Sequence, residues 1–272
     1  MNSSKDFTRG VFYSKKSEQN YTLTRHEPSL SLSQIVETFW NVEWALRSGQ
    51  SHDQRNIPDP CINMVFDTQG ARVVGAVTRT FSVRLSGEGK IFGVKFYPGG
   101  FYALTRKSVS VFSNQERSIN EFFASFEHDL VLELNNTDDA LTKVHCIERF
   151  MQPLIPASID SVIKLTKIIK GIEDDSSILT VEQVSELHGV SIRTLQRLFR
   201  EQVGVSPKWV IRKYRMREVL SLLEQGETNW QDISNGLGYF DQSHFIRDFK
   251  ALIGITPTAY INNLRDIGRS SF

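Results

Sequence analysis

At 272 residues, with 40% hydrophobic and 23% charged residues, the chain has the composition of a globular protein and the length of roughly two domains. It has no apolar run of about 18 residues and begins with a polar stretch, which argues against a membrane span or a secretory signal. We therefore expect a soluble cytoplasmic protein. The net charge of +1 argues against a general affinity for nucleic acid, because phosphate binding depends largely on basic residues.

The first half of the chain is predicted to form a small β-sheet or barrel followed by helices. Short β-prone runs separated by turn residues lie at 61–67, 71–77, 80–86 and 90–97. The last run ends at Pro98, Gly99 and Gly100. At least one helical turn is predicted over residues 101–106. Helices are then expected over 119–134 and 137–154, the second capped by Thr137 or Asp138.

Pro153 and Pro156 lie between two helix-like stretches and are both unfavourable inside a helix, so they mark a domain boundary. The prediction is a two-domain α+β protein. Residues 1–152 form the β-rich domain, 153–158 a linker, and 159–272 an all-helical domain.

A helix, a turn and a second helix are predicted over residues 181–202. Thr180 and Gln183 form a capping box, and Val181, Val184 and Leu187 are expected to face inward. The turn covers residues 188–190, and Ser191 caps the second helix.

The second helix of this unit has one apolar and one polar face. Leu195, Leu198 and Phe199 share the face expected to be buried. Arg193, Gln196, Arg197 and Arg200 share the other. Arg can bond guanine O6 and N7 together, and Gln can bond adenine N6 and N7, so these residue types suit the edges of base pairs.

The same unit recurs fifty residues later, with Asp241 in place of the capping residue Ser191. The matched pairs are Leu195 and Phe245, Arg197 and Arg247, Phe199 and Phe249, Arg200 and Lys250, Gly204 and Gly254, and Pro207 and Pro257. Gln242, Ser243, Arg247 and Lys250 are expected to face outward, with His244 near the start of the helix. Ile246 occupies the place of Gln196 and cannot hydrogen-bond, so the second unit should discriminate less between bases.

The segment 206–226 between the units is predicted to be one long helix. Ser206 is its N-cap, Pro207 its first residue, and Gly226 lies at its end. Eighteen or so residues would span about 27 Å, which can place two reading helices roughly one DNA turn, about 34 Å, apart.

Basic residues concentrate in the same region. Between Ser191 and Arg217, eight basic residues and one acidic residue give a local net charge of +7. The basic residues are Arg193, Arg197, Arg200, Lys208, Arg212, Lys213, Arg215 and Arg217. This local excess predicts double-stranded DNA as a partner.

Residues 160–265, and most specifically "DISNGLGYFDQSHFIRDFKALIGITPTAY", closely resemble the DNA-binding domain of the AraC/XylS family of bacterial transcription regulators. The resemblance implies a sequence-specific transcription regulator with base contacts from Arg193, Gln196 and Arg197, and from Gln242, Ser243, His244 and Arg247. Ser234, where alanine is usual, and Ile246 depart from the family pattern.

The first half, with "GVKFYPGG", resembles an uncharacterised amino-terminal domain of some members of that family, distantly akin to their cupin-like barrels. The resemblance implies that it senses a signal, dimerises, or does both. A small-molecule effector, a second copy of the chain and RNA polymerase are the implied partners. The aromatic residues of this half would either line an apolar pocket or fill the core.

An enzymatic alternative rests on Cys61 as a reactive thiol or alkyl acceptor. No basic residue adjoins it in the sequence to lower its pKa, which favours a buried core thiol. The six histidines show no metal-binding spacing, so neither a metal site nor a cofactor is predicted.

Overall fold

The computed structural model describes residues 19–226, 233, 239 and 241–269. The first half of the chain forms an antiparallel six-stranded sheet in the order β1-β2-β7-β4-β5-β8 and a two-stranded ribbon of β3 with β6. The strands are β1 (Thr22–His26), β2 (Val36–Ala45), β3 (Ser51–Asn56), β4 (Asn63–Asp67), β5 (Gly70–Val74), β6 (Phe81–Ser86), β7 (Glu88–Phe96) and β8 (Glu116–Ser118). The predicted β-rich domain is therefore confirmed.

The four predicted runs are β4, β5, β6 and β7, while β1, β2, β3 and β8 were not predicted. β2 is paired along its length, with β1 on one side and β7 on the other. β3, by contrast, is the polar sequence SHDQRN and carries little β-propensity. It is a strand because its backbone pairs with β6, from Ser51 opposite Ser86 to Asn56 opposite Phe81.

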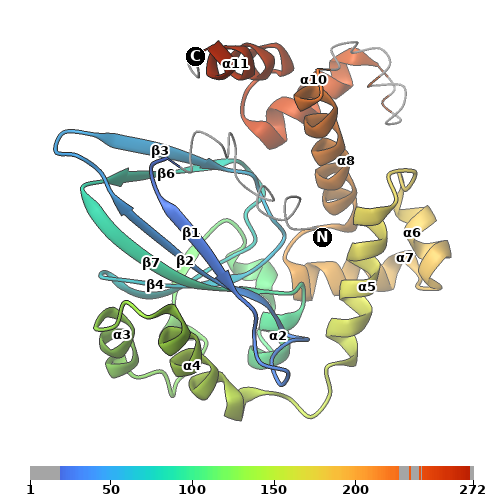
Figure 1. The fold of residues 1–272 in the computed structure, drawn as a ribbon. Helices are drawn as coiled ribbons and strands as arrows, with labels where there is room; N and C mark the ends of the chain where they lie inside the picture. Colours follow the sequence, from blue (N-terminus) through green and yellow to red (C-terminus); the bar gives the residue numbers. More distant parts are fainter. Residues whose placement is uncertain (1–18, 227–232, 234–238, 240, 270–272) are drawn as a thin grey trace.

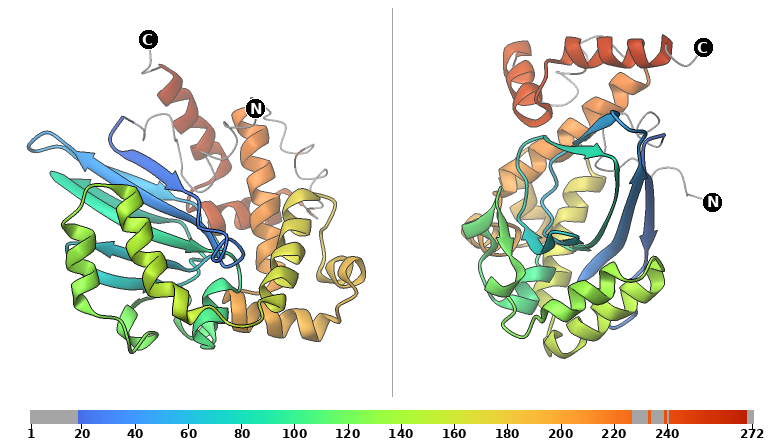
Figure 2. Two further views of the ribbon diagram at one scale, coloured as in Figure 1. Left: turned by 60° about the horizontal axis from the view of Figure 1, so that its bottom comes forward. Right: turned by 90° about the vertical axis from the view of Figure 1, so that its left-hand side faces the viewer.

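Helices cover one face of the sheet (Figures 1 and 2). α3 (His128–Asn135) and α4 (Ala140–Met151) lie there, and α2 (Gly100–Thr105) follows β7 directly, as expected. Between sheet and helices an aromatic cluster forms the core: the rings of Phe66 and Phe92, and of Phe66 and Phe126, lie 6.4 and 6.3 Å apart. Burial of these large apolar surfaces is the main force that holds the layers together.

The prediction of a helix over 119–134 is wrong for the first half of this segment. Only a 3-10 turn, Ile119–Glu121, precedes α3, and Phe126 N donates to the Phe123 carbonyl in a further short turn. A segment rich in phenylalanine has low helix propensity, and here these rings fill the core. The N-cap of α4 is Asp139, which accepts from Thr142 N at 2.8 Å, and not Thr137 or Asp138.

The second half is helical, as predicted. Its helices with described bounds are α5 (Asp160–Asp174), α6 (Val181–His188), α7 (Ile192–Leu198), the π-helical turn η4 (Phe199–Val203), α8 (Pro207–Glu224), α10 (Gln242–Ile253) and α11 (Pro257–Arg269). The capping box of Thr180 with Gln183 is present, and Ser191, Ser206 and Asp241 cap the helices assigned to them. α8 has the expected 18 residues.

Leu187, predicted to face inward, is 60% exposed, and Phe81, one of the aromatic residues predicted to fill the core or line a pocket in the first half, is 40% exposed. Val184 is fully buried, and the next side chain on its face, one turn on, is His188. A Cβ added at Gly171 of α5 would lie 2.9 Å from His188 Nε2, so His188 packs against α5 where Leu187 was expected.

Two apolar cores organise the molecule. The larger one runs from the β-rich half into the first helix-turn-helix unit, where it includes Phe199 and Val203. The second unit has a core of its own, built around Phe245, Phe249 and Tyr260. The domain limits predicted around the linker 153–158 remain a prediction. The first helix-turn-helix unit packs against the β-rich half through the larger core.

Candidate nucleic-acid interface

The first reading helix, defined as α7 with η4, exposes the predicted polar row. Leu195 and Phe199 are fully buried and fix the orientation of the helix. Arg193, Gln196, Arg197 and Arg200 are all exposed. Arg197 lies 3.4 Å from Glu201, one turn on, in an exposed ion pair that costs little to break. The row thus presents hydrogen-bond donors to solvent on one face of the helix, while the opposite, apolar face packs into the core.

The second reading helix, α10, has the same design. Phe245 and Phe249 are fully buried, and Gln242, Ser243, Arg247 and Lys250 are exposed. Ile246 is 36% exposed, so an apolar side chain does lie in the outward row. Arg247 Nε donates to the Ser243 carbonyl at 3.3 Å, which directs the guanidinium back along the helix.

His244 has a second role within the protein. Its ring packs edge-on against the ring of Tyr239, with centroids 5.4 Å apart. Its Nε2 also lies 3.8 Å from Asp248. His244 is therefore partly engaged in packing, although nearly half of its side chain remains exposed.

Asp248 does not lie among the exposed residues of α10. Its side chain is 12% exposed and accepts two hydrogen bonds from Arg212 of α8, at 2.9 and 2.6 Å. A paired and nearly buried carboxylate does not oppose an approaching phosphate as an exposed one would. The outward face of α10 is therefore more favourable to an anion than its sequence indicates.

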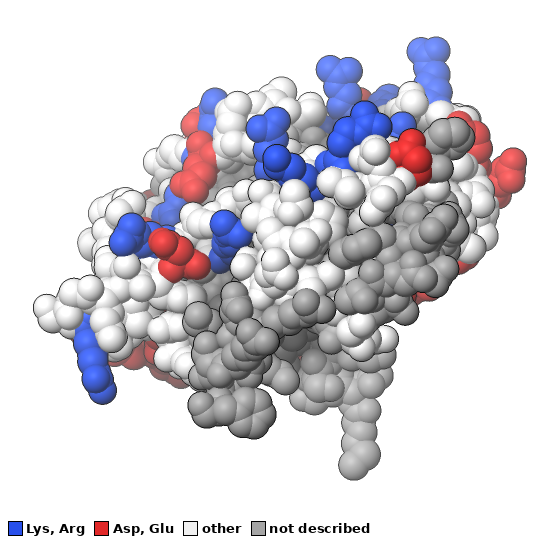
Figure 3. Space-filling view, turned by 90° about the horizontal axis from the view of Figure 1, so that it is seen from above, with Lys and Arg blue, Asp and Glu red and all other residues white. Residues whose placement is uncertain are grey.

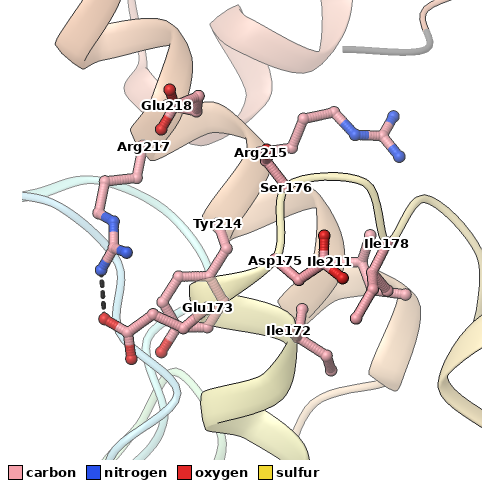
Figure 4. Close-up of a pocket in the computed structure, with 10 residues that line it drawn as sticks. All are labelled: Ile172, Glu173, Asp175, Ser176, Ile178, Ile211, Tyr214, Arg215, Arg217 and Glu218. Atoms are coloured by element: carbon pink, nitrogen blue, oxygen red, sulfur yellow. Dashed lines mark hydrogen bonds and ion pairs between the residues drawn. The ribbon is translucent and has the colours of Figure 1, made fainter. Parts of the chain in front are cut away.

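The local charge of +7 overstates the basic surface, because half of its basic residues hold the fold together. Lys213 pairs with Asp59 at 3.2 Å, and Arg217 pairs with Glu173 of α5 at 2.5 Å (Figure 4). Arg215 donates to the Leu179 carbonyl and lies over the ring of Tyr239. With Arg212 bound to Asp248, the exposed basic residues of this stretch are Arg193, Arg197, Arg200 and Lys208.

α8 separates the two reading helices. α6 and α7 lie toward one end of α8, and α10 and α11 lie at the other (Figure 1). Its 18 residues give a length of about 27 Å. Seen from above, Lys and Arg side chains project along one edge of the molecule, and Asp and Glu side chains lie among them (Figure 3). α8 thus holds the two reading helices toward its opposite ends.

Cys61 is poorly suited to nucleophilic chemistry. Its side chain is buried, and burial together with the negative charge of Asp59 raises the pKa of the thiol well above its usual range. A reactive thiol needs a lowered pKa. In the described part of the chain no group of His, Cys, Asp and Glu side chains is arranged to hold a metal ion. None of the helices described there combines the length and the hydropathy that a membrane span requires.

Two families match the chain. Residues 184–263 match the family described as a helix-turn-helix domain, and residues 24–118 match a domain of unknown function, DUF6597. Both agree with the sequence analysis, which predicted a helix-turn-helix domain after an uncharacterised β-rich domain.

Individual relatives match over the C-terminal part. The chain is 27% identical to an uncharacterized HTH-type transcriptional regulator of Haemophilus influenzae, over 35% of this chain and 32% of the relative. It is 28% identical to the HTH-type transcriptional activator RhaS of Escherichia coli, over 42% of this chain and 39% of the relative. The chain thus matches between about a third and two fifths of the length of these relatives.

Among solved structures, a probable AraC family transcriptional regulator from Rhodopseudomonas palustris is similar at 23% identity, with a TM-score of 0.34. The similarity covers 37% of this chain and 95% of that one.

Proposed function

We propose that this chain, whose C-terminal domain is an AraC-type helix-turn-helix domain, is a sequence-specific transcription regulator that reads two successive major grooves of double-stranded DNA. One observation carries the proposal. Two capped helices, related by a fifty-residue repeat and separated by α8, each bury an apolar face and expose a row of polar and basic side chains that includes Arg and Gln.

In the first reading helix, Arg193, Gln196 and Arg197 are assigned to base edges. They lie toward the N-terminal end of the helix, which is the end that recognition helices direct into the groove. Arg200 lies further along and is assigned, with Lys208, to phosphates, where a charge is sufficient and the base sequence is not read.

In the second reading helix, Gln242, Ser243 and Arg247 are assigned to base edges and Lys250 to a phosphate. His244 is assigned to hold Tyr239 and to approach the backbone of the DNA with its exposed edge. Because Ile246 offers only an apolar contact, such as with a thymine methyl, the second half-site should tolerate more base changes.

The N-terminal domain is assigned a regulatory role. It packs against the first reading helix through a shared core, so a change in this domain can reach the DNA-binding surface. A small-molecule effector, a second copy of the chain and RNA polymerase are the proposed further partners.

Selection of fragments from random DNA tests the proposal. The full chain should enrich one sequence with two conserved blocks about one helical turn apart, and the block contacted by the second reading helix should be the more degenerate. An Arg193→Ala, Arg197→Ala double variant should relax the preference within one block only. Failure to enrich any sequence, or loss of both blocks in the double variant, would contradict the proposal.

A further inference from the structure

The N-terminal domain contacts the C-terminal ends of both reading helices. Ser113 Oγ donates to the Gly204 carbonyl at 2.8 Å, and Thr80 Oγ1 donates to the Leu252 carbonyl at 2.6 Å. Gly204 and Gly254 are equivalent residues of the repeat, and each ends its helix with a φ of +84°. Two hydroxyl groups of one domain thus reach corresponding ends of two helices that the repeat places fifty residues apart.

The contact with the first helix is a close-packed one. A Cβ at Gly204 would lie 2.6 Å from Ser113 Oγ and 3.3 Å from Val109 Cγ2, so only a glycine fits there. Phe112 belongs to the same apolar core as Phe199 of η4. The first reading helix is therefore part of the body of the N-terminal domain.

The contact with the second helix is narrow. The second unit has its own core, against which Ile57 of the N-terminal domain packs. A Cβ at Gly254 would have Thr80 Cβ as its neighbour at 3.8 Å, an ordinary van der Waals distance. The Leu252 carbonyl lies in the last turn of α10, where carbonyls lack a partner within the helix, so the Thr80 hydroxyl supplies the missing donor.

The two contact points are joined within the N-terminal domain. Asn114, next to Ser113, accepts from both Thr78 N and Thr78 Oγ1 at 2.8 and 2.9 Å. Asn114 N donates to the Ala76 carbonyl at 3.0 Å. The segment that carries Thr80 is therefore bonded to the segment that holds the first reading helix.

We propose that Thr80 is a positioning residue that fixes the second reading helix relative to the first and so sets the half-site spacing that the protein accepts. The inference rests on the proposed function. Spacing between half-sites is a geometric property of the two reading elements. The Thr80 contact holds the second reading helix against the N-terminal domain, which also holds the first reading helix. It therefore limits the half-site spacings at which both helices can enter their grooves together.

The test uses the full chain and the DNA site that the wild-type protein selects. The affinity of the protein for this site is compared with its affinity for sites whose central spacer is one base pair shorter or longer. Thr80→Val removes the hydroxyl at nearly constant volume, Thr80→Ser retains it, and Thr68→Val changes an exposed threonine in the turn between β4 and β5. Near-ultraviolet circular dichroism verifies that each variant is folded.

In the wild type, a site with a changed spacer should bind more weakly than the selected site. In Thr80→Val this loss of affinity should be smaller by roughly fivefold, the factor expected for one neutral hydrogen bond. Thr80→Ser and Thr68→Val should keep the wild-type penalty. If Thr80→Val does not fold, Asn114→Gly removes the supporting acceptor, tolerates the φ of +60° at that residue, and should relax the spacing in the same way.

Two results would overturn the inference: an unchanged penalty, which would mean that α8 alone sets the spacing, or an equal loss of affinity at every spacing. If the wild-type protein selects no site at all, the proposed function fails, and that outcome is distinct from a failure of the role assigned to Thr80.

Discussion

Arg212 and Asp248 form an ion pair with two hydrogen bonds that ties α8 to the second reading helix. Nε and Nη2 of Arg212 donate to Oδ2 and Oδ1 of Asp248 at 2.9 and 2.6 Å. Because Asp248 is nearly buried, water cannot replace Arg212 fully when the pair is broken. The orientation of the second reading helix therefore depends on a charge pair whose members are 36 residues apart in the sequence.

Asp248→Ala should lower the free energy of unfolding by about 2 kcal/mol, because Arg212 loses a charged hydrogen-bond partner in a partly buried place. Denaturant unfolding followed by circular dichroism measures the change. Glu201→Ala is the matched control: it breaks the more exposed pair with Arg197 and should cost less than about 0.5 kcal/mol. Equal small losses in both variants would show that the Arg212 pair contributes no more than a surface pair.

The variants Arg197→Ala and Arg217→Ala should distinguish residues that contact bases from residues that stabilise the fold. Both residues belong to the same basic stretch, but Arg197 is exposed while Arg217 binds Glu173. Arg197→Ala should weaken specific binding by about 1–3 kcal/mol, relax the preference at one base pair, and leave the melting temperature unchanged. Arg217→Ala should lower the melting temperature and leave base preferences as they are. Fluorescence anisotropy with single-base variants of the site distinguishes the two, and the reverse pattern would refute the assignment.

Ile246→Gln should increase the selectivity of the second half-site. It introduces a hydrogen-bonding side chain at the place that Gln196 occupies in the first unit, where a good pair discriminates by about 1–3 kcal/mol against a wrong base. Gln196→Ile is the converse variant and should relax the first half-site. Binding to the four alternatives at each base pair measures both effects. No change in either half-site would mean that this helical position does not face the bases.

His188 should make stability depend on pH. Burial lowers the pKa of His188 below its usual 6.5, and Nε2 is buried without a hydrogen-bond partner. Above pH 6.5 the ring is neutral in both the folded and the unfolded states. As pH falls below 6.5 the unfolded chain takes up the proton first, so stability decreases toward the folded-state pKa.

Unfolding in guanidinium chloride at pH 7.5 and pH 5 measures this effect. His188→Gln should reduce the loss of stability between the two pH values, whereas His128→Gln, on the surface of α3, should not. An identical loss in wild type and His188→Gln would assign the pH dependence to other groups.

The sequence was sufficient to predict the second helix of each repeated unit. In the second unit the predicted first helix, Ser234 and the connection 237–240 lie almost entirely outside the described residues. Residue identity at Ser191 and Asp241, and apolar spacing at Leu195, Phe199, Phe245 and Phe249, determine caps and buried faces through local rules. The exposed rows follow from the same periodicity. The exposed residues are Arg193, Gln196, Arg197 and Arg200 in the first unit, and Gln242, Ser243, Arg247 and Lys250 in the second.

The charge distribution could not be predicted in the same way. Arg212, Lys213 and Arg217 look like surface cations in sequence, but their acidic partners lie 36, 154 and 44 residues away. Pairing over such separations is a property of the folded chain. The strand β3 was missed for a related reason, because its polar sequence becomes a strand only beside β6.

Methylation interference on the selected DNA site tests the two-groove arrangement most directly. Methyl groups on guanine N7 lie in the major groove, so they block binding wherever a reading helix enters. The full chain should show two clusters of interference centred about 10 base pairs apart on one face of the duplex. A single cluster, or two clusters on opposite faces, would contradict reading of successive major grooves by α7 and α10.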